Sequence, residues 1–445
     1  MRMTCLLGAV ALAAALAGAP AQGEDLLQIY RDARANDPTL AAAQSNWQAL
    51  QERLPQARSL LLPNVNLTAE ANGNVYDASV RTDPRTEVNG RGYTFGSLTV
   101  QASQPLYRYA NKVAVDQARD QVEQADFSLQ SSRQDLILRV AQAYFDVLLA
   151  QYNVELAESQ KAAVSEQLAQ AKRNFEVGVA TITDTNEAQA QYDAIVAQEI
   201  SAQNDLENRR AALRAIIGRT PRDLKRLGPG FEPQLPSPNN PDYWIDRALA
   251  DNPQVKIAQY NFDIAALEVE RQRAGHLPTL DLVASYNSQA GSGATNLTNS
   301  FNSRQGTIGL ALTVPIYEGG FVNSKVREAI ALQDNARQNL EVARRNATFN
   351  AQTGYTGVAS AAASVKAFEQ ALVSAQVAYE SNRTGQEVGV RTNLDVLNTQ
   401  QQVYQRRRDL AQAYFNYLIG VLRLKSAVGT LDEQALEDVN RRLRG

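Results

Sequence analysis

The stretch LPNVNL at residues 62–67 returns as LPTLDL at residues 277–282, and this repetition decides the fold. Other landmarks recur in the same order in both halves of the chain. They are ANDP at 35–38 and ADNP at 250–253, PLY at 105–107 and PIY at 315–317, EVGV at 176–179 and 387–390, and Gly218 and Gly429. A repeat this long predicts two copies of one structural unit, so function is expected in a duplicated architecture rather than in one catalytic pocket.

Residues 1–21 have the features of a secretory signal peptide. Arg2 is the charged start, residues 6–16 are apolar, and Ala19-Pro20-Ala21 is a small-residue cleavage site. Cys5 is the only cysteine, so a chain without this segment has no disulfide, thiolate metal site or cysteine nucleophile. The 44 basic and 47 acidic side chains give a mild net charge of −3, which offers no reason to expect nucleic acid.

The distribution of proline predicts long helices. Proline is absent from residues 106–220 and 316–445, and both windows are rich in helix formers. Gly178 and Gly389 interrupt these windows, and glycine can end a helix and allow a turn. Each half is therefore expected to hold a long helix, a turn and a returning helix. The expected helices include 108–175 and 185–217, preceded by leading helices at 26–60, which Pro55 ends or bends, and at 243–275.

Apolar residues in both long helices recur at alternating spacings of four and three, the pattern of a coiled coil. The positions are Leu136, Val140, Ala143, Val147, Ala150, Val154 and Ala157, and in the second copy Ala347, Ala351, Gly354, Val358, Ala361, Val365 and Phe368. Two half-length helices placed end to end match one long helix, so we expect a long tube wall. This wall is expected to be interrupted at mid-length, where two half-length helices meet. The proline-rich segment and the C-terminal tail are expected at the same level.

Four segments between the helices alternate apolar and polar residues with the period of a β-strand. The apolar positions are Val65, Leu67, Ala69 and Ala71; Leu98, Val100 and Ala102; Leu280, Leu282, Ala284 and Tyr286; and Ile308, Leu310, Leu312 and Val314. An apolar outer face and a polar inner face are typical of a transmembrane barrel, with residues 77–92 and 288–304 as exposed loops. Open edges are forbidden in lipid, so several protomers must pool their strands, and three would supply about twelve.

These patterns divide the chain into five parts. They are a signal peptide at 1–21, a first repeat at 22–218, a proline-rich equatorial linker at 219–242, a second repeat at 243–429 and a C-terminal equatorial tail at 430–445.

Over essentially the whole mature chain, this pattern resembles the TolC family of outer-membrane efflux and type I secretion channels. The most specific match is the turn, EVGVATITD at 176–184 and EVGVRTNLD at 387–395. The resemblance implies a mainly α fold with a transmembrane β-barrel: a homotrimer whose 12-strand barrel, four strands per protomer, joins a coiled-coil helical barrel in the periplasm. It implies an exit duct without a cofactor in the outer membrane of a Gram-negative bacterium. Proteins or small toxic compounds would reach it from an inner-membrane ABC or proton-driven transporter through a periplasmic adaptor.

Asp184 and Asp395 have two interpretations. Thr181-x-x-Asp184 and Thr392-x-x-Asp395 are capping boxes at the start of a returning helix, and capping accounts for both acids. Alternatively, a threefold axis gathers Asp395 into an acidic ring that favours cations. The resemblance places Asp395 at the periplasmic entrance. Asn398 stands where a second acid is common in the family, so a weaker cation preference is expected.

The resemblance also suggests a latch that holds the entrance closed. Arg391 would reach Thr183 or Asp184 of the other hairpin, whereas the simpler interpretation is a solvated charge. Gln386 stands near the position of a tyrosine found in some family latches, so part of the latch is missing or remodelled. Exposed ion pairs of this kind are worth about 0–1 kcal/mol each, which suits a gate that opens easily.

No sequence motif indicates an enzyme. His276, the single histidine, has no cysteine or second histidine to share a metal with and is expected at the membrane edge. Arg406-Arg407-Arg408 reads as a solvated helix face or as a contact for an adaptor hairpin. The alternatives to a duct are a periplasmic coiled-coil adaptor or structural spacer, which would not need four membrane strands, and an exported enzyme on a helical scaffold.

Overall fold

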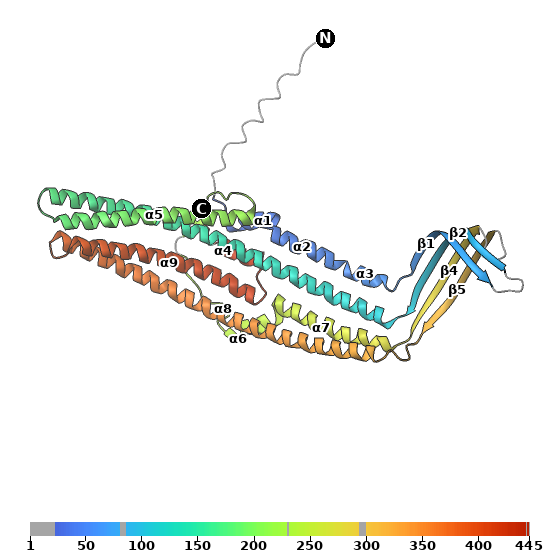
Figure 1. Ribbon diagram of the computed structural model, residues 1–445. Helices are drawn as coiled ribbons and strands as arrows, with labels where there is room; N and C mark the ends of the chain where they lie inside the picture. The colour runs from blue at the N-terminus through green and yellow to red at the C-terminus, as the bar shows by residue number, and fades with distance from the viewer. Residues whose placement is uncertain (1–22, 81–85, 229–230, 293–299, 442, 445) are drawn as a thin grey trace, which may run out of the picture. The chain divides into compact units, whose positions relative to one another are not determined.

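The computed structural model describes residues 23–80, 86–228, 231–292, 300–441 and 443–444, and the expected signal peptide lies outside them. Each half runs through leading helices, two strands, a long helix and a returning helix (Figure 1). The first half comprises α1 (Leu26–Asn36), α2 (Pro38–Gln51), α3 (Arg53–Ser59), β1 (Asn64–Val80), β2 (Thr86–Tyr107), α4 (Tyr109–Glu176) and α5 (Ile182–Ile217). After β3 (Arg226–Leu227), the second half comprises α6 (Pro241–Asp251), α7 (Pro253–Arg273), a 3-10 turn (Ala274–His276), β4 (Thr279–Ser292), β5 (Ser300–Thr313), α8 (Phe321–Glu387) and α9 (Asn393–Ala427). The chain ends with α10 (Glu433–Asn440) and β6 (Leu443–Arg444).

The long and returning helices expected from the distribution of proline are confirmed. Helices α4 and α8 have 68 and 67 residues, and their returning partners α5 and α9 have 36 and 35. At 1.5 Å per residue, α4 is about 100 Å long. The seam residues Leu136 and Val140 are fully buried, and Val365 is buried at the matching seam of α8. Among the described residues, no helix has an apolar stretch long enough to cross a membrane.

The leading helices are not continuous, which corrects the expected single helices. Asp37 separates α1 from α2, and Asn252 separates α6 from α7. Each is followed by a proline, whose ring keeps the preceding residue out of the helical conformation. The observed ψ angles, 117° at Asp37 and 124° at Asn252, are accordingly extended. The first leading helix has a second interruption at Glu52, between α2 and α3, and Pro55 lies in the first turn of α3, where its missing N–H is tolerated. The expectation that the helix ends or bends near Pro55 is therefore confirmed.

Both of these residues also cap the helix that follows. The Leu40 N–H donates to Asp37 Oδ1 at 2.7 Å, and the Gln254 N–H donates to Asn252 Oδ1 at 2.8 Å. Only Asp37 carries a charge, and Arg139 donates to its two carboxylate oxygens at 2.9 and 3.2 Å. The two repeats therefore cap the helix after the break with different side chains, Asp37 in the first and Asn252 in the second.

The four strands expected from alternation form one antiparallel sheet in the order β1-β2-β4-β5. The two hairpins have equivalent registers, since Asn64 lies opposite Ser103 and the matching Thr279 lies opposite Thr313. The strands are longer than expected and include parts of the polar stretches 77–92 and 288–304 that were expected as loops. Hairpin pairing satisfies the backbone of these polar residues, so polarity alone does not end a strand.

The chain divides into two compact units, and both repeats contribute to each. Among the described residues, one unit comprises those within 23–44, 129–255 and 344–444, and the other comprises those within 45–128 and 256–343, which include the four-stranded sheet. The largest fully buried side chains of the first unit are Tyr144, Phe145, Leu26, Ile29, Leu136, Leu213, Ile217, Leu418, Leu422 and Leu436. In the second unit, Phe127 of α4 stacks on Tyr260 of α7 with 5.8 Å between ring centroids.

The described residues of the proline-rich segment before α6 pack on α9, and among them only Arg226 and Leu227 of β3 form a strand. The ring of Phe231 lies 5.9 Å from that of Tyr414 and 5.7 Å from that of Tyr417. The Tyr417 hydroxyl accepts from the Gln234 N–H at 2.9 Å and donates to the Gln234 carbonyl at 2.8 Å. Beyond α9, Gly429 adopts a φ of 79°, and a Cβ there would collide with the backbone carbonyl of Asp251. Glycine is therefore required at this turn for conformation and for space.

Candidate functional site

The two helix-hairpin turns carry most of the residues singled out in the sequence. Gly178 lies between α4 and α5 with a φ of 78°, and Gly389 lies between α8 and α9 with a φ of 80°. The Val179 N–H donates to the Asn174 carbonyl at 2.9 Å, and the Val390 N–H donates to the Gly385 carbonyl at 2.8 Å. A Cβ at either turn glycine would meet no atom within 4 Å, so their requirement is conformational rather than steric.

Both capping boxes expected from the sequence are confirmed. The Thr181 N–H donates to Asp184 Oδ2 at 2.9 Å, and the Asp184 N–H donates back to Thr181 Oγ1 at 3.3 Å. At the second turn, the Thr392 N–H donates to Asp395 Oδ2 at 3.0 Å, and the Asp395 N–H donates to Thr392 Oγ1 at 3.2 Å. The backbone and hydroxyl hydrogen bonds from Thr392 lower the pKa of the Asp395 carboxyl. Asp395 is therefore an anion held in a fixed orientation by its own turn.

The predicted entrance residues lie on one face at the start of α9. Asp395 is partly exposed, and Asn398 is exposed three residues later, where helical spacing places it beside the aspartate. A ring at a constriction needs the same residues from other copies of the chain. The acidic ring therefore stays a prediction.

The predicted latch residues make contacts within their own hairpins. The Gln386 side-chain amide donates to Asn393 Oδ1 at 3.2 Å across the second turn. The stem of Arg391 lies beside Gly385, where a Cβ would come within 2.7 Å of the Arg391 Cγ. Thr183 and Asp184 both lie at the start of α5, and no ion pair or hydrogen bond in the described part of the chain joins either of them to Arg391. The latch also stays a prediction.

The tips of both turns are apolar and exposed, a property that was not predicted from the sequence. The exposed fractions are 72% for Val177 and 74% for Val179, and 68% for Val388 and 75% for Val390. The signal was present in the two EVGV motifs, where valine flanks a turn glycine on both sides. Each turn therefore presents two apolar side chains to the surroundings.

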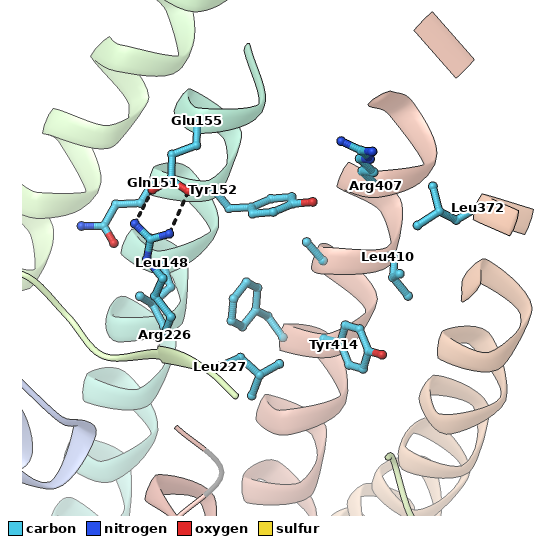
Figure 2. A pocket seen from close by; sticks show the side chains of 12 residues that line it. Leu148, Gln151, Tyr152, Glu155, Arg226, Leu227, Leu372, Arg407, Leu410 and Tyr414 are labelled. Atoms are coloured by element: carbon cyan, nitrogen blue, oxygen red, sulfur yellow. Dashed lines mark hydrogen bonds and ion pairs between the residues drawn. The ribbon is translucent and has the colours of Figure 1, made fainter. Parts of the chain in front are cut away.

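A cavity of about 370 Å³ lies between α4 and α9, beside β3 (Figure 2). Its wall is mostly apolar and aromatic, with Tyr152 of α4 and Tyr414 of α9 among its lining side chains. Arg226 of β3 forms an ion pair with Glu155 at one side, shown by the dashed lines in Figure 2. This cavity was not predicted, because its walls come from segments far apart in the sequence.

The three consecutive arginines of α9 point to different partners. Arg406 donates to Asp409 at 3.0 Å, and the Arg407 guanidinium lies 5.6 Å from the centroid of the Tyr404 ring. The Arg408 guanidinium lies against the side-chain amide of Gln198 on α5. The run is therefore not one solvated patch, and Arg407 lines the cavity of Figure 2.

His276 lies in the 3-10 turn that joins α7 to β4. Its Nε2 atom is 3.2 Å from Asn323 Oδ1, and its side chain is exposed. Among the residues that the structure describes, no group of three or more histidine, cysteine or acidic side chains could hold a metal ion.

Comparisons with known proteins agree over nearly the whole chain. The family model described as outer membrane efflux protein matches residues 29–219 and 244–430. The chain is 36% identical over 423 residues to the outer membrane protein TolC of Vibrio cholerae, covering 95% of this chain and 94% of that protein. It is 33% identical to the alkaline protease secretion protein AprF of Pseudomonas aeruginosa, covering 93% and 86%. The crystal structure of the outer membrane protein VceC from Vibrio cholerae superposes with a TM-score of 0.74 at 20% identity, covering 91% of this chain and 96% of that one.

Proposed function

Because this chain belongs to the outer membrane efflux protein family, we propose that it is the outer-membrane exit duct of a tripartite efflux or type I secretion system. The observation that carries the proposal is the combination, in one chain, of an antiparallel sheet with two open edges and two long helical hairpins. The periplasmic adaptor or spacer alternative does not account for that sheet. The family is one of channels, and a passive duct needs no catalytic residue.

The open sheet edges support a homotrimer in the outer membrane. Within the described strands, β1 and β5 each pair on one side only. In lipid, an unpaired backbone donor or acceptor costs several kcal/mol, so these edges must find strands from other copies. Three chains with four strands each give a closed sheet of about the size that surrounds a water-filled path.

The exposed valines at the hairpin turns support a partner at that end of each hairpin. A periplasmic adaptor that covers Val177, Val179, Val388 and Val390 would remove four large apolar side chains per chain from water. Burial of one such side chain contributes about 1.5–3 kcal/mol. An inner-membrane ABC or proton-driven transporter would then supply the energy, since the duct itself is passive.

The second turn supports a gate. In a trimer, three copies of Asp395 would form an acidic ring, and the hydrogen bonds from Thr392 that lower the pKa of this carboxyl would oppose the rise caused by repulsion among the three. Arg391 would hold neighbouring hairpins together through Thr183 or Asp184 once the hairpins close. Such exposed pairs contribute little singly, so the closed state would be only a few kcal/mol more stable than the open one.

The native mass of the mature protein, extracted from outer membranes in detergent, tests the proposed duct. A mass close to three chains is expected, together with a conductance in planar bilayers. A monomer that stays out of the membrane fraction would contradict the proposal and would favour a periplasmic adaptor or spacer instead.

A further inference from the structure

The cavity beside β3 is lined by both helical hairpins and lies wholly within one of the two compact units (Figure 2). Its volume of about 370 Å³ is near the lower end of the range, about 300–1,000 Å³, in which proteins bind small molecules. Three aromatic side chains line it, Tyr152 from α4 and Tyr414 and Phe415 from α9. Leucine side chains of α4, β3, α8 and α9 add to this apolar lining. A small ligand with an aromatic body therefore matches the lining.

Contacts behind the aromatic lining hold it in place. Phe415 is 9% exposed, and its ring lies 5.6 Å from that of Phe145, which is almost fully buried. The Tyr414 hydroxyl donates to Glu369 of α8, outside the lining, at 2.5 Å. The ring of Phe231 also lies 5.9 Å from the ring of Tyr414. Both rings are therefore positioned before a ligand arrives, which lowers the entropy cost of binding.

One positive charge in the lining lacks an acidic partner. Arg226 forms an ion pair with Glu155, and their side chains are 69% and 44% exposed. Arg407, in contrast, is partly buried and forms no ion pair or hydrogen bond with any residue that the structure describes. With two arginines and one glutamate, the lining has an excess of positive charge, which favours an anionic ligand.

The guanidinium of Arg407 is held beside the cavity by an aromatic ring. It lies 5.6 Å from the centroid of the Tyr404 ring, a cation–π distance, and the Tyr404 hydroxyl donates to the Ser159 carbonyl of α4 at 3.3 Å. Tyr152 reaches from α4 toward α9 in Figure 2, and its hydroxyl has no hydrogen-bond partner within the described ranges. Burial raises the pKa of the Tyr152 phenol, against the opposite effect of the Arg407 charge, so this hydroxyl keeps its proton and can donate.

We propose that this cavity binds a small aromatic carboxylate, with its ring against the aromatic lining and its carboxylate at Arg407. An arginine guanidinium can donate two parallel hydrogen bonds to the two oxygens of a carboxylate. The proposal does not depend on the duct function, because every lining residue belongs to one chain. A bound ligand would contact α4 of one hairpin and α9 of the other, so it would favour the arrangement in which these two helices lie beside each other.

Binding of naphthoate to the mature protein extracted from membranes in detergent tests the proposal. Naphthamide is the comparison probe, because it has nearly the same shape without the charge. Isothermal titration calorimetry should show one naphthoate site per chain, with a Kd about tenfold lower than that for naphthamide. This factor corresponds to the weaker end of the range for a hydrogen bond to a charged group. Arg407→Gln should remove the preference for the anion, because it keeps the aromatic lining and removes the charge.

Arg408→Gln is the matched control. The Arg408 guanidinium lies against Gln198 of α5, outside the cavity lining. This variant removes the same charge from the same helix and should leave both Kd values unchanged. Tyr152→Phe keeps the ring and removes the hydroxyl, so it should reduce the preference less than Arg407→Gln does. Uptake of the probes by detergent micelles is the same for every variant and does not affect this comparison.

Two results would overturn the proposal. One is the lack of saturable naphthoate binding to the wild type, which would also follow if a neighbouring copy of the chain filled the cavity. The other is a preference for naphthoate that persists in Arg407→Gln or falls equally in Arg408→Gln, because the anion would then be held elsewhere. Either result leaves the duct function intact, since that function is tested by the native mass.

Discussion

Both repeats have a helix break, but only the first has a charged pair there, between Asp37 and Arg139. Replacement of Asp37 would measure how much stability this pair contributes. The Asp37 side chain is only 3% exposed and receives the Arg139 guanidinium and the Leu40 N–H. Asp37→Ala removes a cap, at about 1 kcal/mol, and a charged hydrogen-bonded pair, at about 1.5–3 kcal/mol. Arg139 is about a third exposed and still pairs with Asp135 at 2.7 Å when Asp37 is removed. The contribution of the Asp37–Arg139 pair should therefore lie near the lower end of its range. The expected loss is about 2–3 kcal/mol of the free energy of unfolding.

Asp37→Asn separates these two contributions, because Asn252 shows that an asparagine caps the equivalent helix. This variant should keep the cap and lose only the charge, so it should be about 1 kcal/mol more stable than Asp37→Ala. Asp135→Asn is the matched control: its carboxylate is 60% exposed, and its loss should cost less than about 1 kcal/mol. Urea unfolding followed by far-ultraviolet circular dichroism gives the three values.

The dependence on pH adds a second readout. Hydrogen bonding from Arg139, followed by that from the Leu40 N–H, lowers the pKa of Asp37 in spite of its burial. A carboxyl with a lowered pKa in the folded state contributes stability above its ordinary pKa, and this contribution is lost as the pH falls through the folded value. The wild type should therefore lose more stability in acid than Asp37→Asn. Equal losses for Asp37→Asn and Asp37→Ala at neutral pH, or an unchanged acid response, would refute this account.

Three further predictions use other parts of the molecule. Gly429→Ala should lower the temperature of thermal unfolding more than Gly178→Ala does. Both glycines have a positive φ, but only at Gly429 would the new Cβ collide with a backbone carbonyl, and equal decreases would contradict this prediction. Burial raises the pKa of Glu268, but hydrogen bonds led by that from Arg271 outweigh it and lower the value from 4.5 to about 2. Between these pH values the wild type should lose free energy of unfolding as the pH falls, and Glu268→Gln should lose less. Parallel dependence on pH in the two proteins would contradict the lowered pKa of Glu268. Asp395→Asn should reduce cation preference and block by multivalent cations in planar bilayers, and unchanged selectivity would rule out an acidic ring.

Much of the architecture could be predicted from local sequence. The family resemblance, the mainly helical fold and the outer-membrane location are confirmed. Proline-free windows located α4 and α8, and the T-x-x-D patterns located the capping boxes, since each depends on residues close in the chain. The breaks at Asp37 and Asn252 were not predicted although both precede a proline, because helices lie on both sides of each single extended residue.

The candidate site was less predictable, for a physical reason. The cavity beside Tyr152 is built from α4, β3 and α9, and nothing local in any of them indicates the others. The partner of Arg408 likewise depends on a neighbouring helix, since Gln198 lies on α5, whereas Arg406 and Arg407 have partners within α9 itself. The acidic ring and the latch depend on contacts among copies of the chain, which local patterns do not specify.

The open edges of the sheet also bear on how the protein is made. A single folded chain offers two long rows of unpaired backbone groups and the exposed side chains of Ile316 and Tyr317. Edges of this kind join any strand they meet, including strands of unrelated unfolded chains. If the chain forms the proposed trimer, a newly exported copy is exposed to such pairing until two other copies join it, and its yield should depend on the rate of synthesis and on the holding chaperones of its compartment. Overproduction of the chain would be expected to yield aggregates before it yields more ducts.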